Sequence, residues 1–495
     1  MAWDKQRATA RIKQHMVRAP KVDPKLSLLE HRNIMKAEAL QKSATKSFPN
    51  GVALLVEGAH LYGQMMNFNE IVLDQDRTET EASHRRILTF LNAYYQVWDS
   101  IVDGEDAIRV DFHGPRLHAI VVEPKGKPQE QVRKAVALAD KLNEAMRQIA
   151  AAYNIPATFR FGIDHGNCLA MTAGRSHDTD TLFLGRPANH AAKLAAKEKD
   201  GPGVHLTDHA DSILNDRPSD PWKTGVAAPQ RLLEELRKSF TFTSIDAATQ
   251  KVVQAALQRP NFTFVRPTLP LSSVDFDDLV PSRTIRRGMV SLFADIDGYT
   301  KFVDNAMREG IEAIRRAVVG IHTIREELND VLKEDFKGKR VRFIGDCIHG
   351  LMAEGQEKDD PKGTVQDAVE CATAMKSSFK LCTTIVEGLA PLDLAIGIEY
   401  GPIPLTRIGH PGEESIRCAA GLAVVVSELQ QQGIEGGGFS MGPEAHRHAN
   451  DNVRKYFSSG VLHEYPVAAN LLGLPTSPVV KIVSEQPSAR SYSDR

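Results

Sequence analysis

The sequence predicts two α/β sandwiches in one chain, each with its elements in the order β-α-β-β-α-β. Two observations predict this fold. Short segments of the C-terminal half repeat segments of the N-terminal half at a spacing of 231 to 238 residues, which indicates the duplication of a domain. In both halves, runs of β-branched residues alternate with longer stretches of helical periodicity. This order of elements is typical of a ferredoxin-like sandwich.

The hydrophobic pattern predicts each element in turn. In the N-terminal half these are a strand over 52–56, a helix over 84–101, a hairpin of strands 109–112 and 117–122, a helix over 129–153, a strand over 158–163 and a helix from about 187. The C-terminal half repeats them as a strand over 289–294, a helix over 308–331, a hairpin around 345, a helix over 364–386, a strand over 392–399 and a helix from about 422. Helical spacing of apolar residues defines the helices, and a glycine between two β-rich runs defines each hairpin.

The repeats predict domains over residues 48–215 and 285–485, with two further segments outside them. Residues 1–47 are rich in Lys, Arg and Ala and contain few helix breakers, which favours an N-terminal helical extension. Residues 216–284 are irregular and punctuated by proline, which favours a linker or arm packed on the domains.

The composition excludes several classes of protein. With 42% hydrophobic residues, 25% charged residues and a formal net charge of -2, the chain has no basic excess that would indicate a nucleic acid partner. No run of about 18 apolar residues predicts a membrane span, and the N-terminus lacks the apolar core of a secretory signal. The five cysteines are scattered, without a zinc spacing, and suit a reducing cytoplasm.

Two aspartates carry the chemistry of the C-terminal repeat. Asp295 ends a predicted strand, and Asp346 follows the hairpin glycine Gly345. If the two strands are neighbours, the carboxylates converge, and two hard oxygen ligands suit Mg²⁺ or Mn²⁺ bound together with substrate phosphates. The stretch 296–300 precedes a helix and can direct backbone N–H groups at a triphosphate. Either aspartate alone could instead cap a turn, but the presence of both favours a metal site.

Two segments around these aspartates resemble a known family. The stretches 293–300 (FADIDGYT) and 344–347 (IGDC) resemble the two metal-binding motifs of class III nucleotidyl cyclases. The resemblance covers residues 48–215 and 285–450, strongly in the second stretch and faintly in the first. It implies two cyclase homology domains that pair head to tail as a pseudo-heterodimer. In that family one domain supplies the metal ligands, and the other supplies the base-reading residues and an Asn–Arg pair.

The resemblance implies a residue-by-residue assignment of the metal half. Two ions of Mg²⁺ or Mn²⁺ are expected at three positions, which are Asp295, the backbone of Ile296 and Asp346. The substrate is expected to contact Gly298, Tyr299 and Thr300 at the start of the following helix. The corresponding metal positions of the N-terminal repeat are expected to be Glu57 and Pro115, and a proline side chain cannot coordinate a metal.

The resemblance also assigns the catalytic pair. Asn189 stands four residues after Gly185, at the family's Asn position, and Lys193 stands where the family has Arg. Lysine lacks the bidentate fork of arginine, and a solvated lysine on a helix face is the alternative interpretation. In the C-terminal repeat the same positions are Val425 and Leu429, which cannot serve a phosphate. One complete site is therefore expected, built from both halves, and the second interface site is expected to be inactive.

The base-reading positions depart from those of purine cyclases. Adenylate cyclases use Lys and Asp there and guanylate cyclases use Glu and Cys, whereas this chain has Asp111 and Leu182. A carboxylate accepts a hydrogen bond from guanine N1–H and amino groups, from uracil N3–H or from the cytosine amino group. The shorter acid and the apolar wall resemble the pyrimidine cyclases of bacterial antiphage (Pycsar) systems, and a single N3–H contact favours UTP. The alternative is that Asp111 faces solvent.

The sequence therefore predicts a cytoplasmic lyase that converts UTP to cyclic UMP and diphosphate, with the product acting as a second messenger in antiphage defence. The alternatives are a guanylate or adenylate cyclase, and an inactive nucleotide-sensing scaffold. A diguanylate cyclase is disfavoured because its Gly-Gly-acid-acid-Phe turn is missing. The expected partner is the nucleoside triphosphate, with no nucleic acid and no membrane. A homodimer remains open, because the sequence does not decide whether the site forms within one chain or between two.

Overall fold

The structure is a computed structural model that places most of the chain. It describes residues 3–23, 51–73, 78–104, 107–175, 178–197, 200–220, 225–239, 247–258, 260–411, 415–456, 462–464 and 479–481. Of the predicted N-terminal helical extension, residues 5–18 form a helix, and residues 24–50 lie outside the described residues. None of the described helices is long and apolar enough to cross a membrane.

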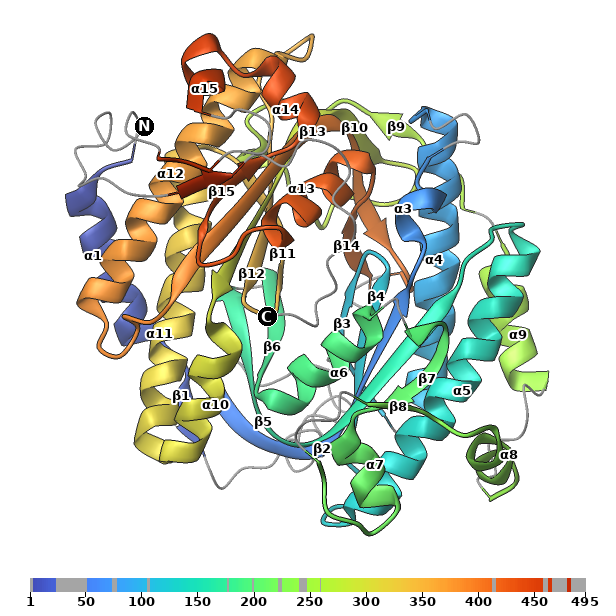
Figure 1. The fold of residues 1–495 in the computed structure, drawn as a ribbon. Coiled ribbons are helices and arrows are strands. Elements are labelled where there is room, and N and C mark those ends of the chain that lie inside the picture. Colours follow the sequence, from blue (N-terminus) through green and yellow to red (C-terminus); the bar gives the residue numbers. More distant parts are fainter. Residues whose placement is uncertain are drawn as a thin grey trace, which may run out of the picture.

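The first half is a twisted sheet with two long helices on its outer face (Figure 1). Its strands are β1 (Lys21–Asp23), β2 (Val52–Met65), β3 (Ile108–His113), β4 (Arg116–Val121), β5 (Phe159–Arg175), β6 (Asp178–Leu184), β7 (Gly203–Leu206) and β8 (Val226–Ala227). Its helices are α3 (Phe68–Ile71), α4 (Glu81–Gly104), α5 (Pro128–Ala152), α6 (Arg186–Ala196), α7 (Asp208–Leu214), α8 (Gln230–Ser239) and α9 (Ala247–Ala256). The connecting residues, predicted to be irregular, thus contain two helices, and α8 and α9 pack on the outer helices.

The second half repeats this arrangement. Its strands are β9 (Phe264–Val265), β10 (Thr284–Asp297), β11 (Lys339–Ile344), β12 (Cys347–Met352), β13 (Asp393–Ile408), β14 (Ile416–Ala419), β15 (Gly438–Met441), β16 (Leu462–Glu464) and β17 (Val479–Lys481). Its helices are α10 (Tyr299–Glu309), α11 (Ile311–Asp330), α12 (Pro361–Ile385), α13 (Leu422–Gln432), α14 (Pro443–His448) and α15 (Asp451–Tyr456), with short turns at Leu271–Ser273 and Val331–Asp335. The helix predicted over 308–331 corresponds to α11, which begins after a bend at Gly310, whose φ is +102°.

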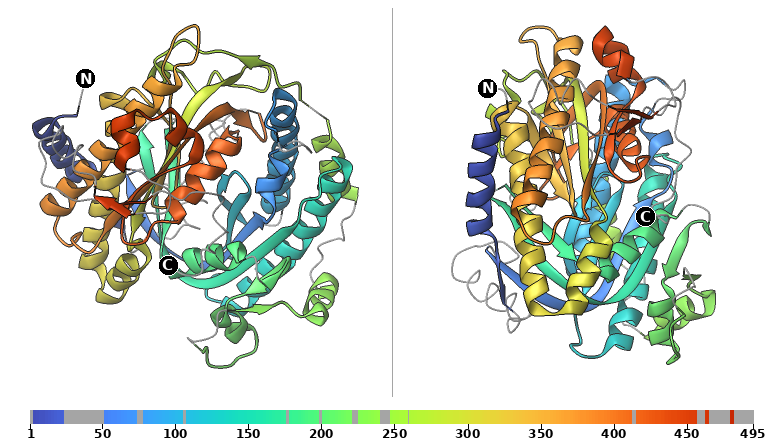
Figure 2. Two further views of the ribbon diagram at one scale, coloured as in Figure 1. Left: turned by 45° about the horizontal axis from the view of Figure 1, so that its top comes forward. Right: turned by 60° about the vertical axis from the view of Figure 1, so that its left-hand side comes forward.

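The strand orders confirm the predicted fold. The first sheet has the order β3-β4-β2-β5-β7-β8, and the second has the order β11-β12-β10-β13-β15-β17-β16. The first five strands of each order correspond one to one, and each half contains the β-α-β-β-α-β unit of a ferredoxin-like sandwich. α4 and α5 cover the outer face of one sheet, and α11 and α12 cover the outer face of the other, so the two inner faces lie toward each other (Figures 1 and 2).

One helix of each half packs directly on the inner face of its own sheet, at a glycine. A Cβ atom on Gly162 of β5 would lie 2.2 Å from the carbonyl oxygen of Ala191 in α6. In the second half, a Cβ atom on Gly397 of β13 would lie 2.3 Å from the carbonyl oxygen of Ser427 in α13. Only glycine permits this approach, so α6 and α13 occupy equivalent places at the interface.

The halves exchange hairpins. Leu169, Leu182 and Leu184 of the β5–β6 hairpin are buried in the core of the second half. In return, Ile408 and Cys418 of the β13–β14 hairpin are buried in the core of the first half, against α4. Apolar burial of this kind is the main favourable contribution to association. The two domains therefore pair within one chain.

The strand register corrects one predicted correspondence. Asp295 lies opposite Ala395 in the β10–β13 ladder, and the repeat equates Ala395 with Arg160. The residue opposite Arg160 in the β2–β5 ladder is Gln64. The counterpart of Asp295 in the first half is therefore Gln64, and the assignment to Glu57 is wrong. β2 runs on for several residues beyond Glu57, which is exposed on this long strand.

The N-terminal helix α1 (Lys5–Arg18) lies beside the outer helices of the second half (Figure 2), and a network of charged side chains joins it to them. Arg11 donates to both oxygens of Glu327, at 3.0 and 2.7 Å, and to Asp335. Glu327 also accepts a hydrogen bond from Ser378, whose hydroxyl in turn accepts from the indole of Trp3. The Glu327 side chain is fully buried, so the guanidinium balances a charge that has no access to water.

Replacement of Arg11 by Met is expected to destabilise the fold by about 3–5 kcal/mol, because it leaves a buried carboxylate without its partner. The matched control is Arg7→Met on the same helix, whose more exposed ion pair with Asp335 should contribute at most about 1 kcal/mol. Urea denaturation followed by circular dichroism measures both. Equal losses for the two variants would contradict this account of α1.

Candidate active site

The two predicted metal ligands lie on neighbouring strands. Asp295 is near the end of β10, and Asp346 is in the two-residue turn between β11 and β12, directly after Gly345, whose φ is +58°. β12 pairs with β10, with Ala294 opposite Ile348, so the turn reaches the end of the metal strand. Both carboxylates are partly buried, and Ile296 between them is buried.

The two carboxylates are close enough to act on each other's charge. Burial raises the pKa of Asp346 well above its usual value, and the negative charge of Asp295 raises it further, while Arg325 and Lys193 lower it. Both carboxylates also act on the neighbouring Cys347. Burial raises the pKa of its thiol most, and the negative charges of Asp295 and Asp346 raise it further. Two acids that repel each other at a partly buried point form a site where a cation is stabilising.

The donor set fits a hard divalent cation. Among the described residues no group of three or more His, Cys, Asp or Glu side chains could hold a metal by itself. Mg²⁺ characteristically takes one or two carboxylates and completes its shell with water and substrate phosphates. The hydroxyl of Tyr299 adds to this picture: it is buried close to Asp346 and has no hydrogen-bond partner among the described residues. Asp295, Asp346 and the carbonyl of Ile296 would hold such an ion.

The predicted phosphate-binding turn opens a helix at this point. Gly298 adopts a left-handed conformation with φ of +81°, and α10 begins at the next residue, Tyr299. The first N–H groups of a helix have no partner inside the helix and carry partial positive charge, which favours an anion. Thr300 in the same turn is partly buried. The helix start, with Gly298, Tyr299 and Thr300, therefore lies beside the two acids, as predicted.

The first half contributes its catalytic pair to the same place. The side-chain amide of Asn189 on α6 donates a hydrogen bond to the hydroxyl of Thr300 on α10, at 3.1 Å. Lys193 lies one turn further along α6, and its positive charge lowers the pKa of Asp346, against the larger effects of burial and Asp295. The structure thus brings Asn189 of one half against the start of α10 in the other, and Lys193 close enough to Asp346 to act on its charge.

A carboxylate of the second half caps the helix that carries this pair. Gly185, the residue before α6, has no side chain with which to cap it. Asp304 of α10 instead accepts a hydrogen bond from the backbone N–H of Arg186, in the first turn of α6. Burial raises the pKa of Asp304, and the charges of Arg186, Arg308 and Lys193 oppose that rise. Capping by a residue of the other half was not predicted, because it depends on how the halves meet.

The two base-reading positions have different surroundings. Leu182 on β6 is buried among apolar side chains of the second half. Asp111 on β3 is not free in solvent: it forms an ion pair with Arg342 of β11, and both side chains are mostly buried. Arg342 was missed from the sequence. The available signal was its position three residues before Gly345, which matches the position of Asp111 before Gly114.

An aromatic group lies on the inner face of the first sheet, near Tyr299. Tyr62 of β2 stacks on His118 of β4, with ring centroids 4.0 Å apart, and lies close enough to influence the Tyr299 hydroxyl. Nδ1 of His60 is 3.0 Å from Nε2 of His118. Burial lowers the pKa of His60 to about 3 and that of His118 well below its usual value, so both rings are neutral at neutral pH. The sequence analysis did not single out these residues, although His60 and Tyr62 alternate along one face of β2.

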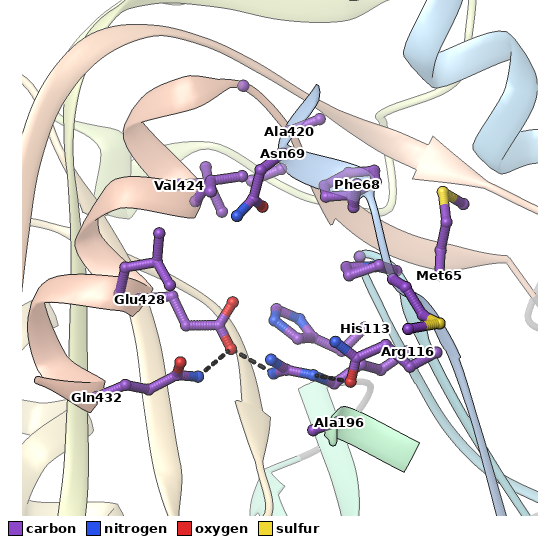
Figure 3. A pocket seen from close by; sticks show the side chains of 18 residues that line it. Met65, Phe68, Asn69, His113, Arg116, Ala196, Ala420, Val424, Glu428 and Gln432 are labelled. Atoms are coloured by element: carbon purple, nitrogen blue, oxygen red, sulfur yellow. Dashed lines mark hydrogen bonds and ion pairs between the residues drawn. The ribbon is translucent and has the colours of Figure 1, made fainter. Parts of the chain in front are cut away.

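The second interface site is a partly open cavity lined by residues of both halves (Figure 3). Gln64, the counterpart of Asp295, accepts a hydrogen bond at 3.3 Å from the guanidinium of Arg116. Arg116 forms an ion pair with Glu428 of α13, and Gln432 donates to the same carboxylate at 3.3 Å. Figure 3 shows this pair spanning the cavity. Pro115 stands at the position of Asp346. The guanidinium of Arg116 therefore lies where the first site has its two carboxylates.

The opposite wall of that cavity is apolar at the two positions that correspond to the predicted catalytic pair. Val425 and Leu429 of α13 line it at the positions that correspond to Asn189 and Lys193. With no carboxylate pair on one wall and no phosphate-binding side chain at these two positions of the other, the cavity lacks both halves of the chemistry. Among the described residues, the first interface site brings together Asp295, Asp346, Thr300, Asn189 and Lys193.

Comparison with known proteins decides the family. Residues 61–227 match the model of the adenylate and guanylate cyclase catalytic domain. A protein from a Rhizobium species, named uridylate cyclase, is 36% identical over an alignment of 523 positions that covers 99% of both chains. The chain belongs to the class III nucleotidyl cyclases.

Two further relatives agree with this assignment. A protein from Pseudomonas aeruginosa, also named uridylate cyclase, is 35% identical to this cyclase, over 89% of this chain and 86% of the relative. A solved structure, described as a class III adenylyl cyclase-like ATP-binding protein from Pseudomonas aeruginosa, has a TM-score of 0.80 at 31% identity. It covers 92% of this chain and 96% of that chain, so the tandem arrangement is shared along almost the whole length.

The metal assignment predicts a binding result that does not need substrate. Mn²⁺ is expected to raise the melting temperature of the unmodified cyclase, because a bound cation stabilises the folded state by mass action. Asp295→Asn and Asp346→Asn should each remove this increase. The control is Gln64→Ala at the corresponding position of the second site, which should retain it. An undiminished increase in both aspartate variants would place the metal elsewhere.

Proposed function

We propose that the cyclase converts UTP to 3′,5′-cyclic UMP and diphosphate at the first interface site. The observation that carries the proposal is the composite site itself: Asn189 reaches Thr300 across the interface, and Lys193 acts on the acid pair of the other half. The choice of UTP is supported by the two relatives named uridylate cyclase and by a carboxylate, Asp111, in place of the family's purine-reading residues.

The acid pair prepares the substrate for attack. Divalent cations held by Asp295, Asp346 and the carbonyl of Ile296 would supply Lewis-acid activation of the ribose 3′-hydroxyl and neutralise charge on the phosphates. The 3′-oxygen forms a bond to the α-phosphorus, the bond from that phosphorus to the diphosphate oxygen breaks, and the hydroxyl proton passes to solvent. The first turn of α10, from Gly298 to Thr300, presents its N–H groups to the leaving diphosphate.

The opposite half stabilises the transition state and orients the sugar. Lys193 places a positive charge beside the α-phosphoryl group, where negative charge is redistributed during the transfer. Asn189 exchanges its Thr300 contact for the ribose and so fixes the angle of attack, which contributes through orientation. A lysine is a point charge without the paired donors of arginine, so its placement depends on the rigidity of α6. The cap that Asp304 gives to α6 supports that rigidity.

We further propose that cyclic UMP serves as a second messenger in antiphage defence in the cytoplasm. The support is the resemblance of the base-reading positions to those of Pycsar pyrimidine cyclases. Cells that carry the gene together with its neighbouring genes should resist phage infection, and an Asp346→Ala version should not. Equal plaque numbers with both versions would remove the proposed role and leave the cyclase reaction untouched.

A nucleotide panel is expected to show UTP as the preferred substrate. With Mn²⁺ and each of UTP, CTP, GTP and ATP, mass spectrometry should detect cyclic UMP as the main product. Asp111→Asn should lower kcat/KM for UTP by about 10- to 100-fold, because it replaces the charged acceptor of a buried N–H by a neutral amide that offers a donor in place of one oxygen. It should also relax selectivity toward CTP, whose N3 is an acceptor.

Preferential formation of cyclic GMP or cyclic AMP by the unmodified protein would overturn the choice of base but not the reaction.

The composite site predicts the behaviour of mixed variants. Asn189→Ala should strongly lower kcat, and Asp346→Ala should abolish turnover. Because the two halves pair within one chain, a mixture of the two variant proteins should recover no activity. Recovery on mixing would show that the site forms between two chains of a homodimer. Full activity of Asn189→Ala alone would contradict the composite site.

A further inference from the structure

We infer that Arg342 forms the second half of the base-reading group, so that an Asp111–Arg342 ion pair spanning both halves recognises uracil. This inference rests on the proposed function and identifies a specificity-determining residue that the family comparison does not supply. The starting observation is the ion pair itself, which joins β3 of one half to β11 of the other. The Arg342 side chain is 10% exposed and that of Asp111 is 19% exposed, so the pair keeps one accessible edge.

The strand geometry directs both side chains to the inner faces. Each strand carries a bulge at this point: the register shifts between Arg109 and Asp111 in one hairpin and between Arg340 and Arg342 in the other. A bulge redirects the side chain at its position. Asp111 lies opposite His118, whose ring stacks on Tyr62 at the inner face.

The second hairpin is arranged in the same way. Arg342 lies opposite His349, whose ring stacks on Phe293 with centroids 4.2 Å apart. Paired residues of an antiparallel ladder share a face of the sheet. Asp111 and Arg342 therefore both face the interface between the halves, on the same inner faces that carry Tyr62 and the metal strand β10.

The charges around the pair favour a carbonyl oxygen as the third partner. A second guanidinium, that of Arg417 on β14, also acts on Asp111: burial lowers the pKa of Arg417 to about 10, and the Asp111 charge opposes that change. Asp111 thus forms an ion pair with Arg342 and also lies close enough to Arg417 to act on its charge. A guanidinium can only donate hydrogen bonds, and a carboxylate can only accept them. An uncharged ligand therefore fits this pair when it places an acceptor beside the guanidinium and a donor beside the carboxylate.

Uracil has that order of groups along its edge. Its O4 accepts a hydrogen bond and its adjacent N3–H donates one, so O4 can take an N–H of Arg342 while N3–H is given to Asp111. Cytosine has the reverse order, with a donating amino group at C4 and an acceptor at N3. A fixed donor–acceptor pair therefore accepts uracil and leaves cytosine with two mismatched contacts. A site built to hydrogen-bond its substrate rejects the mismatched analogue strongly.

The decisive variant exchanges the two charges. Asp111→Arg combined with Arg342→Asp keeps an ion pair across the interface but reverses the order of donor and acceptor. The ratio of kcat/KM for UTP to kcat/KM for CTP should therefore fall, so that the preference moves toward CTP. Arg342→Met alone should lower kcat/KM for UTP by about 10- to 100-fold and bring the ratio close to one. Arg342→Lys keeps the charge and one donor and should retain part of the UTP preference.

The matched control is Arg287→Met in the same half, because Arg287 is also buried and ion-paired, with Asp359, near the start of β10. It should leave the UTP to CTP ratio unchanged. Product mass spectrometry measures the ratio even at low turnover, and circular dichroism checks the fold. If Arg342→Met slows UTP and CTP equally, or the charge-exchanged protein still prefers UTP, Arg342 does not read the base. If the unmodified protein does not prefer UTP at all, the proposed function itself fails.

Discussion

Each half buries one of its hairpins in the apolar core of the other half. This exchange determines where the functional groups lie. The β5–β6 hairpin inserts Leu182 and Leu184 among the apolar side chains of the second half, and α6 follows β6 through Gly185 without a linker. The position of that hairpin therefore fixes the helix that carries Asn189, which lies 3.1 Å from Thr300. Chemistry that needs a metal strand from one half and a charged helix from the other thus depends on apolar packing between them.

The parts of the site that lie in short local motifs could be predicted from the sequence. Asp295 at a strand end and Asp346 after a hairpin glycine are defined by their nearest neighbours in the chain, and the structure places them together. The fold could also be predicted, because each helix and strand is defined by a local hydrophobic pattern and the two halves repeat the same order of elements. The match of Asp295 to Glu57 failed because the spacing between the repeats is not constant. β2 is one uninterrupted strand of 14 residues, and only its ladder with β5 shows that Gln64 is the true counterpart.

Contacts between the halves could not be predicted in this way. Asp304 as the cap of α6, Arg342 as the partner of Asp111, and Arg116 as the partner of Glu428 each join residues more than a hundred positions apart. No periodicity or local spacing records such a pair, because the pairing depends on the relative placement of two separately folded sheets. These contacts also distinguish the two interface sites, so the difference between the sites was only partly visible in the motifs.

The fusion of two domains in one chain makes such pairs available. Asp111 and Arg342 occupy equivalent positions of the two repeats and meet near the centre of the interface. In a symmetric pair of identical domains the same residue would stand at both positions. Like charges would then face each other at a partly buried point, where repulsion is only weakly screened.

A single chain removes that restriction, because the two repeats can change independently. One repeat can then carry an acid and the other a guanidinium, and the interface gains a fixed donor and a fixed acceptor side by side. Asymmetry between the halves is therefore a physical requirement for a base-reading pair of this kind, and it accompanies the loss of the second site.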